Sequence, residues 1–236
     1  ERLASTSTVI GIFKNNELVK QAVEGDLVKI IVNRTPFYAE SGGQIGDKGL
    51  ITSQDLEVSI ENVRKKKNIF IHSGIVNTGV LKVNSSVQMN VTPSFRQRTT
   101  SNHTATHLLQ SALKLSIDSS VSQRGSLVSN DRLRFDFNAP KPLTKKELED
   151  MEVQINQWIN EDHPIQIKTM PIKEAMAAGA LAMFGEKYGD VVRVVDVPGV
   201  SMELCGGTHV TRTSQLGTFK IINETGIASG IRRIEA

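Results

Sequence analysis

The sequence of 236 residues predicts an α+β fold in two parts, an all-β unit over residues 1–92 and a mixed unit over residues 93–236. Three observations predict this division. The first part is rich in β-branched residues and turn formers and has no sustained helical period. The second part mixes helical and strand patterns without a strict βαβ repeat. Pro93 lies where the pattern changes and marks the expected boundary.

Short runs of β-branched and apolar residues, separated by Gly, Asn and Asp, predict five strands in the first part. The runs cover residues 9–14, 26–33, 56–63, 68–74 and 87–91. Several short strands joined by tight turns are typical of small all-β units. We therefore expect a small barrel or a sandwich-like unit here.

Three helices are expected in the second part. Apolar residues recur at helical spacing over 99–115, where Ser101 or Asn102 could form the N-cap. Residues 144–147 read Thr-Lys-Lys-Glu, a capping box that predicts the start of a second helix. Pro171 suits the first turn of a short third helix. Strands are expected over residues 131–137, 165–170, 191–197 and 218–223.

The composition is ordinary for a globular protein, and its charge favours an anionic partner only mildly. The net charge is +3 and the pI is about 9.0. The single cysteine excludes an internal disulfide and is typical of a reducing compartment. No apolar run approaches the roughly 20 residues that span a bilayer. We expect a cytoplasmic protein without a membrane partner, with a plastid or a mitochondrion left open. Because the first residue is Glu, we also expect a piece of a longer chain.

Two pairs of residues have the spacing of metal ligands. His103 and His107 are four residues apart and fall on one face of the predicted helix, opposite Leu108 and Ala112. Cys205, the only cysteine, precedes His209 by four residues across a Gly-Gly pair that lets the backbone curl. Together they offer a thiol and three imidazoles, the ligand types that zinc prefers. The sequence therefore predicts a zinc site.

The spacing excludes two common zinc chemistries. The HTATH segment lacks the glutamate of the HExxH metalloprotease helix, and no H-x-E with C-x-x-C is present. About a hundred residues separate the two ligand pairs, which is more typical of an active site assembled by a fold than of a zinc finger. His72 and His163 are not paired with another histidine or cysteine at this spacing, and we expect them at a strand end and a helix end.

Five segments of the sequence closely resemble the editing domain of alanyl-tRNA synthetases and the related freestanding alanyl-tRNA editing proteins. The segments are TPFYAESGGQIGDKG (35–49), NHTATHLLQSAL (102–113), VSQRGSLVSNDRLRFDF (121–137), ALAMFGEKYGD (180–190) and ELCGGTHV (203–210). The resemblance implies a β-barrel subdomain over 1–92 and an α/β editing subdomain over 93–236, with zinc on His103, His107, Cys205 and His209. It favours the synthetase-derived form over the freestanding one.

The resemblance also implies an activity and its partners. The activity is zinc-dependent hydrolysis of the aminoacyl ester of tRNA(Ala) mischarged with serine or glycine, sparing Ala-tRNA(Ala). The expected partners are the acceptor end of that tRNA and the remainder of the synthetase chain. Cys205, His103, His107 and Gln123 are the catalytic candidates. The aminoacyl group is expected to contact Gln123 together with Glu40, Ser41, Gly42, Gly43 and Gln44.

Several readings stay open at this stage. Four protein ligands would fill a tetrahedral shell, so the role of zinc in the reaction is not fixed. A non-catalytic tRNA-binding module with a structural zinc is the main alternative. Glu203 lies near the ligands in sequence, but we expect a surface carboxylate there rather than a general base. Arginine side chains could contact tRNA phosphates, and the candidates are Arg96, Arg98, Arg232 and Arg233.

Overall fold

The computed structural model describes residues 2–182 and 188–236, and its chain divides into two compact units. The first unit comprises residues 1–41 and 45–97, and the second comprises residues 42–44 and 98–236. The second unit thus takes three residues from a loop that lies early in the sequence. Within the described ranges, no helix has the length and apolar character needed to cross a membrane.

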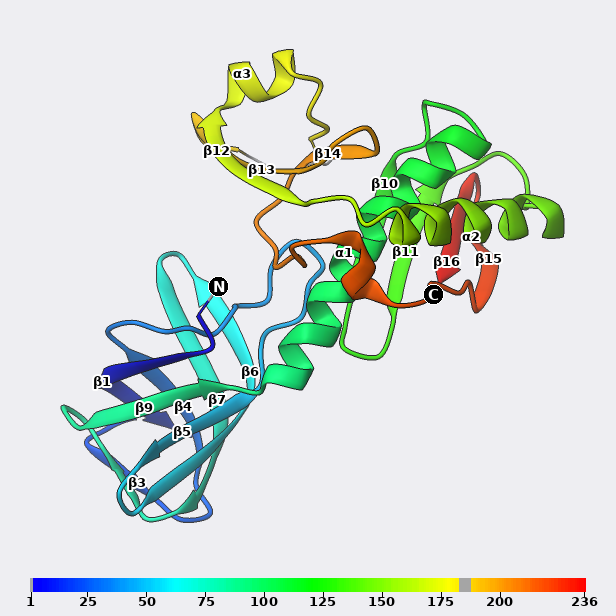
Figure 1. Ribbon diagram of the computed structural model, residues 1–236. Helices are drawn as coiled ribbons and strands as arrows, with labels where there is room; N and C mark the ends of the chain where they lie inside the picture. Colours follow the sequence, from blue (N-terminus) through cyan, green and yellow to red (C-terminus); the bar gives the residue numbers. More distant parts are fainter. Residues whose placement is uncertain (1, 183–187) are drawn as a thin grey trace. The chain divides into compact units, whose positions relative to one another are not determined.

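The first unit is a closed antiparallel barrel (Figure 1). Six strands follow the order β1-β4-β7-β6-β5-β9, and the pairing of β9 with β1 closes the ring. The bounds are β1 Ala4–Lys14, β4 Leu27–Val32, β5 Gly49–Ser53, β6 Leu56–Lys66, β7 Ile69–Thr78 and β9 Ser86–Val91. Strand β2 (Glu17–Val19) pairs with β1, and β3 (Gln21–Val23) pairs with β8 (Val80–Lys82). The barrel, rather than the sandwich, is therefore the form that the first part takes.

Alternating apolar residues fill the barrel, because successive side chains of a strand point to opposite faces. In β6, Val58 and Ile60 are buried, whereas Glu61 at the next position is exposed. All five strands expected from the sequence are present, although β1 begins earlier and β7 continues further than expected. Strand β5 was not expected, since its glycine and its two small polar residues resemble a turn segment.

Helices and small sheets form the second unit (Figure 1). Helix α1 (Pro93–Ser116) begins in the first unit and belongs to the second from Arg98 onward. A four-stranded sheet has the order β10-β11-β16-β15, and a three-stranded sheet has the order β12-β13-β14. The bounds are β10 Gln123–Val128, β11 Leu133–Asn138, α2 Lys145–Asn160, β12 Gln166–Pro171, α3 Ile172–Ala177, β13 Val191–Val197, β14 Ser201–Leu204, the 3₁₀ turn η1 Thr213–Leu216, β15 Asn223–Ala228 and β16 Ile231–Glu235.

The main core of the second unit joins α1, α2 and the four-stranded sheet. Leu108 and Leu109 of α1 pack in one cluster with Met151 and Ile155 of α2 and with Phe135 of β11, and all are fully buried. The aliphatic face of α1 is used for this contact, as its periodicity predicts. The histidine face of the same helix is therefore left for other partners. The chain is α+β, with more strand than helix in the described residues.

Two local predictions for the second unit are wrong, and one is confirmed. Helix α1 begins at Pro93, so Ser101 and Asn102 lie inside it and cap nothing. Residues 218–222 form no strand, because the backbone N–H and C=O of Phe219 both bond the side-chain amide of Asn156 instead of a neighbouring strand. The capping box between Thr144 and Glu147 is present in both directions at the start of α2.

Candidate metal centre

The two histidines of α1 lie one turn apart on the same face of the helix. The ring centroids of His103 and His107 are 5.4 Å apart, and both residues are only 5% exposed. The spacing of four residues therefore produces the shared face that the sequence predicts. Two buried imidazoles side by side need a partner of complementary chemistry, because burying polar groups without one costs free energy.

That partner is the turn that follows β14. Cys205 Sγ lies 3.4 Å from His103 Nε2 and 3.3 Å from His209 Nε2. One ligand atom from each of His103, His107, Cys205 and His209 lies within 4.8 Å of the others. The fold thus brings together two pairs of residues that are about a hundred positions apart. These four residues form a group that could hold a metal ion.

The donor set fits a tetrahedral ion such as zinc. A sulfur and a nitrogen that share a tetrahedral zinc ion stand roughly 3.5 Å apart, given bonds of about 2.3 and 2.0 Å. The two Sγ to Nε2 distances in the cluster are 3.4 and 3.3 Å. A thiolate and three imidazoles are also the side chains that such an ion prefers. The composition of the cluster, and the spacing of its sulfur from two of its imidazoles, are therefore compatible with a zinc ion.

The electrostatics of the cluster favour the ligand form of the thiol. Burial alone would raise the pKa of Cys205, but the charge of His103 and the hydrogen bonds from the imidazoles hold that pKa well below its usual range. Burial, together with the charge of His103, lowers the pKa of His209 to about 3. Burial would lower the pKa of His107 as well, but the neighbouring Glu203 and Cys205 raise it to about 9. The thiolate is the form that binds metals.

An arginine outside every recognised motif binds backbone carbonyls of the cysteine turn. Arg193 of β13 donates from Nη1 to the carbonyl oxygens of Cys205 at 2.7 Å and Gly207 at 2.8 Å. Its own carbonyl accepts from the Cys205 N–H at 3.0 Å. Arg193 therefore fixes the turn from both sides. Only the pairing of β13 with β14 brings it there, so no local motif could have identified it.

Glu203 is buried, and the expectation of a surface carboxylate is wrong. The residue is 6% exposed, and Ser201 donates a hydrogen bond to its Oε1 at 3.0 Å. Its Oε2 lies 3.7 Å from His107 Nδ1. That imidazole nitrogen finds no hydrogen-bond partner among the described residues. Glu203 points inward because the residues of β14 alternate, and this position faces the histidines rather than solvent.

A small polar cavity lies beside the cluster in the second unit. It measures about 280 Å³, and Gln123, the first residue of β10, and Glu203 are among its lining residues. The other lining residues are Gln110, Lys114, Ser122, Arg124, Leu181 and Ala182. Glu203 therefore faces both the imidazole of His107 and this cavity. The volume suits a group of a few heavy atoms, since drug-sized ligands occupy about 300–1,000 Å³.

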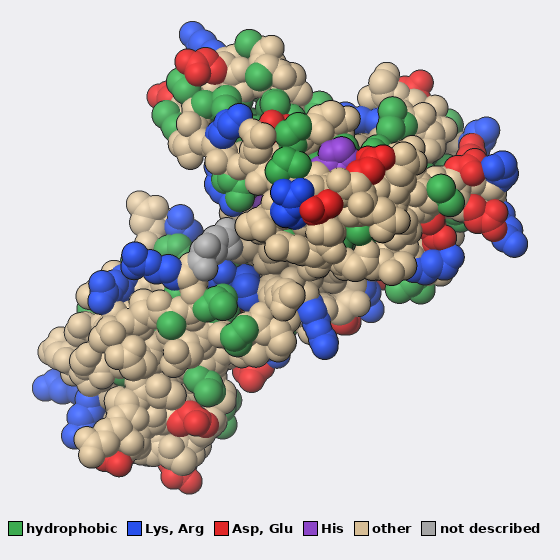
Figure 2. Space-filling view, in the orientation of Figure 1, with side chains coloured by type: hydrophobic (Ala, Val, Ile, Leu, Met, Phe, Trp, Pro, Cys, Tyr) green, Lys and Arg blue, Asp and Glu red, His purple; other side chains and the backbone are tan. Residues whose placement is uncertain are grey.

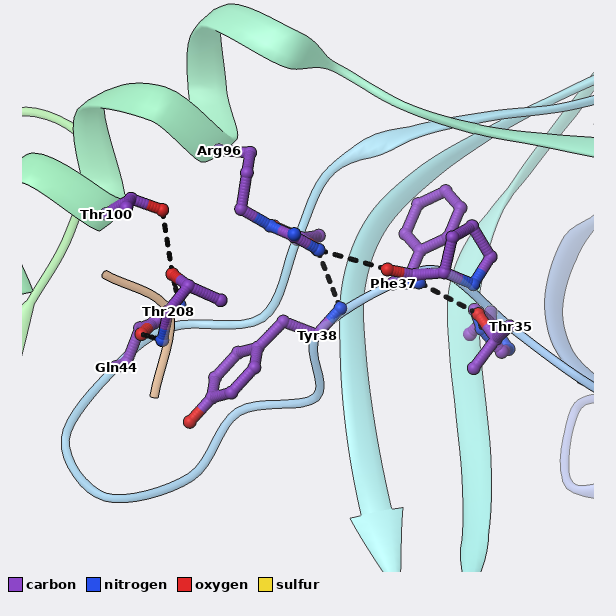
Figure 3. A network of polar contacts seen from close by, with 10 residues as sticks. Thr35, Phe37, Tyr38, Gln44, Arg96, Thr100 and Thr208 are labelled. Atoms are coloured by element: carbon purple, nitrogen blue, oxygen red, sulfur yellow. Dashed lines mark hydrogen bonds and ion pairs between the residues drawn. The ribbon is translucent and has the colours of Figure 1, made fainter. Parts of the chain in front are cut away.

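The expected aminoacyl loop, residues 40–44, is divided between the two units. Glu40 and Ser41 are exposed residues of the first unit, where Glu40 pairs with Arg64 at 3.2 Å. Gly42, Gly43 and Gln44 belong to the second unit. Gln44 is completely buried there and bonds His103 and Thr208. Thr208 in turn accepts a hydrogen bond from Thr100 at 2.8 Å (Figure 3).

The four arginines proposed to contact tRNA have different surroundings. Arg96 is buried and bonds the Asp47 carboxylate at 2.9 Å and the Pro36 carbonyl at 3.0 Å, which argues against a phosphate contact. Arg232 pairs with Glu224, and Arg233 pairs with Asp136. Arg98 is exposed. On the face that Figure 2 shows, Lys and Arg side chains are spread among acidic ones rather than gathered in one patch.

The two remaining histidines lie outside the cluster, as expected. His163 follows the end of α2 and bonds Glu161 at 2.7 Å. His72 lies inside β7 rather than at a strand end, and it is completely buried in the barrel. The resembling segment at 180–190 contains residues 183–187, which lie outside the described residues.

Comparison with known proteins first defines a class. Residues 1–94 match the family model of class II (A) tRNA synthetases. Residues 192–235 match the model of the second additional domain of threonyl- and alanyl-tRNA synthetases, and this range contains Cys205 and His209. The chain is therefore related to class II aminoacyl-tRNA synthetases, and half of the candidate metal centre lies in the matched additional domain.

The relatives then narrow this class. The chain is 95% identical over all 236 residues to an alanine–tRNA ligase of Prochlorococcus marinus (strain NATL1A). It is 56% identical over 234 residues to that of Microcystis aeruginosa and 55% identical over 232 residues to that of Synechococcus elongatus. It spans 26–27% of the length of these relatives. Over nearly its whole length the chain therefore matches part of alanine–tRNA ligases, and the resemblance to alanyl-tRNA synthetases found in its sequence is confirmed.

Proposed function

We propose that the chain is the editing domain of an alanyl-tRNA synthetase. In this proposal it hydrolyses the aminoacyl ester of tRNA(Ala) mischarged with serine or glycine and spares Ala-tRNA(Ala). The observation that supports it best is the group of His103, His107, Cys205 and His209 beside a small polar cavity. The barrel would form one subdomain, and residues 93–236 the catalytic one. The acceptor end of the tRNA and the rest of the synthetase would be the partners, in the cytoplasm of the cell.

The chemistry requires an editing site because size alone discriminates poorly. A missing methylene is worth only about 1–3 kcal/mol of binding, so a pocket for alanine cannot reject glycine strongly. A site built to hydrogen-bond a hydroxyl can disfavour an analogue without it by roughly 10⁴-fold. The polar lining of the cavity by Gln123 and Glu203 fits such a site for serine.

The four ligand residues would hold zinc, which when bound can polarise an ester carbonyl or lower the pKa of a water molecule. The chain's own residues would supply binding and orientation. In the cavity, the Glu203 carboxylate would attract the α-ammonium group of the aminoacyl moiety. The Gln123 amide would hydrogen-bond the serine hydroxyl or the ester oxygen. Arg98 would contact a phosphate near the acceptor end.

One observation favours the alternative of a non-catalytic tRNA-binding module with a structural metal. Four protein ligands converge, and closed four-ligand shells are typical of structural zinc sites. Cys205 is nevertheless only partly buried, unlike the three histidines of the group. The cavity beside Glu203 also gives a small group a place to bind. We therefore favour the hydrolase.

Hydrolysis of Ser-tRNA(Ala) and Ala-tRNA(Ala) by the zinc-loaded chain tests this function. We expect loss of the seryl ester alone, and no hydrolysis by a folded Cys205→Ala variant. Gln123→Ala should lower the rate by roughly 10²-fold, the cost of removing one hydrogen bond to the reacting group. The matched control is Gln157→Ala, which changes an exposed glutamine of α2 outside the cavity. A folded, zinc-loaded chain that hydrolyses neither ester would instead support the binding module.

A further inference from the structure

Within the second unit, Gln44 uses both lone pairs of its amide oxygen and one of its two amide N–H groups. The residue is 0% exposed. Its Oε1 accepts from the Thr208 N–H at 2.9 Å and lies 2.6 Å from His103 Nδ1, and its Nε2 donates to Thr208 Oγ1 at 2.9 Å. A substrate could bond the amide oxygen only by displacing one of these partners, and the side chain is completely buried. The side chain is therefore built into the protein rather than offered to a ligand.

These contacts determine which nitrogen of His103 carries the proton. A backbone N–H can only donate, so the amide atom that faces the Thr208 N–H must be the oxygen. An amide oxygen only accepts, so His103 Nδ1, which lies 2.6 Å from the same oxygen, must be the donor. In the neutral ring, which is the form that binds a metal, Nε2 then carries the lone pair, and it lies 3.4 Å from Cys205 Sγ. The ring is thus held in the tautomer that binds a metal through Nε2.

His209 is held in the same tautomer by Thr104. The Thr104 hydroxyl donates to the Thr100 carbonyl at 3.2 Å and accepts from the Val210 N–H at 3.2 Å. Since its one proton is used on the carbonyl, His209 Nδ1, at 3.1 Å, must donate to it. Nε2 of His209 then faces Cys205 Sγ at 3.3 Å. Gln44 and Thr104 thus each accept a hydrogen bond from Nδ1 of one candidate ligand, and together they form an outer layer around the cluster.

Close backbone packing holds Gln44 in this position. The Gly43 carbonyl accepts from the Val128 N–H at 2.8 Å, and a side chain on Gly43 would stand 2.9 Å from the Ser126 carbonyl oxygen. Gly207 lies against the ring that Gln44 orients, since a Cβ there would stand 2.0 Å from His103 Cε1. Gly43 also has a φ of +80°, which favours glycine. Both Gly-rich segments are therefore needed to bring Gln44 to His103.

We propose that Gln44 is a positioning residue of the metal centre and not a contact of the aminoacyl group. Its amide oxygen fixes His103 with Nδ1 protonated and Nε2 directed at the metal, and its two bonds to Thr208 fix the turn between Cys205 and His209. The inference rests on the proposed metal site. Partners of ligating histidines typically change metal affinity by about 10- to 100-fold when removed.

Two variants of Gln44 test this role through zinc affinity, measured by competition with a chromogenic chelator. Gln44→Met keeps the length of the side chain but removes the acceptor, and we expect zinc to bind about 10- to 100-fold more weakly. Gln44→Glu keeps an acceptor for His103 and for the Thr208 N–H, and we expect it to restore affinity to nearly that of the wild type. Gln123→Met, the same change in the cavity, should leave zinc affinity unaltered.

A measurement on the wild-type chain keeps the inference testable even if Gln44→Met does not fold. The nitrogen chemical shifts of His103, from ¹⁵N-histidine NMR, should report a protonated Nδ1 both with and without zinc. A wild-type His103 protonated at Nε2, or a folded Gln44→Met variant with undiminished zinc affinity, would overturn the proposal. If the wild type binds no zinc, the proposed function loses its metal, while the tautomer of His103 still tests Gln44. A wild-type chain that binds zinc but hydrolyses neither ester would count only against the deacylase.

Discussion

His72 in the barrel shares a tautomer with His103 and His209 of the second unit, but these histidines differ in what Nε2 faces. His72 Nδ1 lies 3.1 Å from the Ile30 carbonyl, so this nitrogen donates. Its Nε2 lies 2.8 Å from the Thr35 hydroxyl, which donates to it. In His103 and His209 the Nδ1 also donates to a protein oxygen, but Nε2 faces the sulfur of Cys205.

The comparison shows that burial alone does not distinguish a structural histidine from a ligand. His72 is more deeply buried than His103 or His209. Both of its ring nitrogens form hydrogen bonds within the barrel, one with the Thr35 hydroxyl and one with the Ile30 carbonyl. His103 and His209 each bond a protein oxygen through Nδ1, whereas their Nε2 atoms face the candidate metal position beside Cys205 Sγ. The group that Nε2 faces therefore distinguishes a structural histidine from a candidate metal ligand. Substitutions confined to one unit test this distinction.

The largest effect is expected for loss of the thiolate. Cys205→Ala removes one of the four ligands, so zinc affinity should fall by more than the roughly 100-fold that an outer partner can cost. Chelator competition measures this directly. His72→Asn serves as the control in the barrel, and its zinc affinity should equal that of the wild type. Weaker zinc binding in the His72 variant would remove the distinction between the two kinds of histidine.

The next effect is a pH dependence confined to the barrel. Burial lowers the pKa of His72 to about 4, although the bond to the Ile30 carbonyl opposes this. The unfolded chain, with a pKa near 6.5, binds the proton more readily, so barrel stability should be lost as the pH falls from about 6.5 to 4. A shift of this size amounts to roughly 3 kcal/mol at most. Hydrogen exchange of the amides of β6 and β7 measures it.

This pH dependence should be the same with and without a chelator, because His72 lies in the barrel core. His72→Asn should flatten the dependence between pH 6.5 and pH 4. An unchanged slope in that variant would mean that other groups cause it.

The smallest effects come from a matched pair of threonine substitutions. Thr35→Val removes the hydroxyl that donates to His72 Nε2, and leaving a buried acceptor unpaired should cost the barrel about 1–3 kcal/mol. Thr104→Val removes the acceptor of His209 Nδ1, and zinc affinity should fall by about 10- to 100-fold. Urea unfolding and zinc titration of both variants check the pair. If Thr35→Val weakened zinc binding, the two units could not be treated separately.

The grouping of the four candidate ligands could be predicted from sequence because each pair lies on one local element. A spacing of four puts His103 and His107 on one helix face, and a Gly-Gly turn lets Cys205 and His209 converge. Each pair alone is a common pattern, so only their combination, with the family resemblance, was informative. The barrel could be predicted for a similar reason, since its strands carry strong period-two patterns between turn residues.

The outer layer could not be predicted, because its contacts join residues that are far apart in the chain. Gln44 and Thr208 are 164 positions apart, and Thr104 and His209 are 105 positions apart. A glutamine after a Gly-Gly pair in a loop resembles a substrate contact, and nothing local indicates that it is buried. Arg193 and Glu203 were missed in a different way, since the direction in which a strand residue points depends on what packs against each face.

The division of the ligand cluster between distant parts of the sequence has a consequence for the order of events during protein synthesis. His103 and His107 leave the ribosome well before Cys205 and His209, with about a hundred residues between the pairs. At roughly 5–20 residues per second, this interval lasts about 5 to 20 s. Gln44 is made earlier still, but Thr208, which orients its amide, comes with the second pair. The nascent barrel can therefore close while His103 and His107 still lack the thiolate and Gln44 still lacks Thr208, which orients its amide.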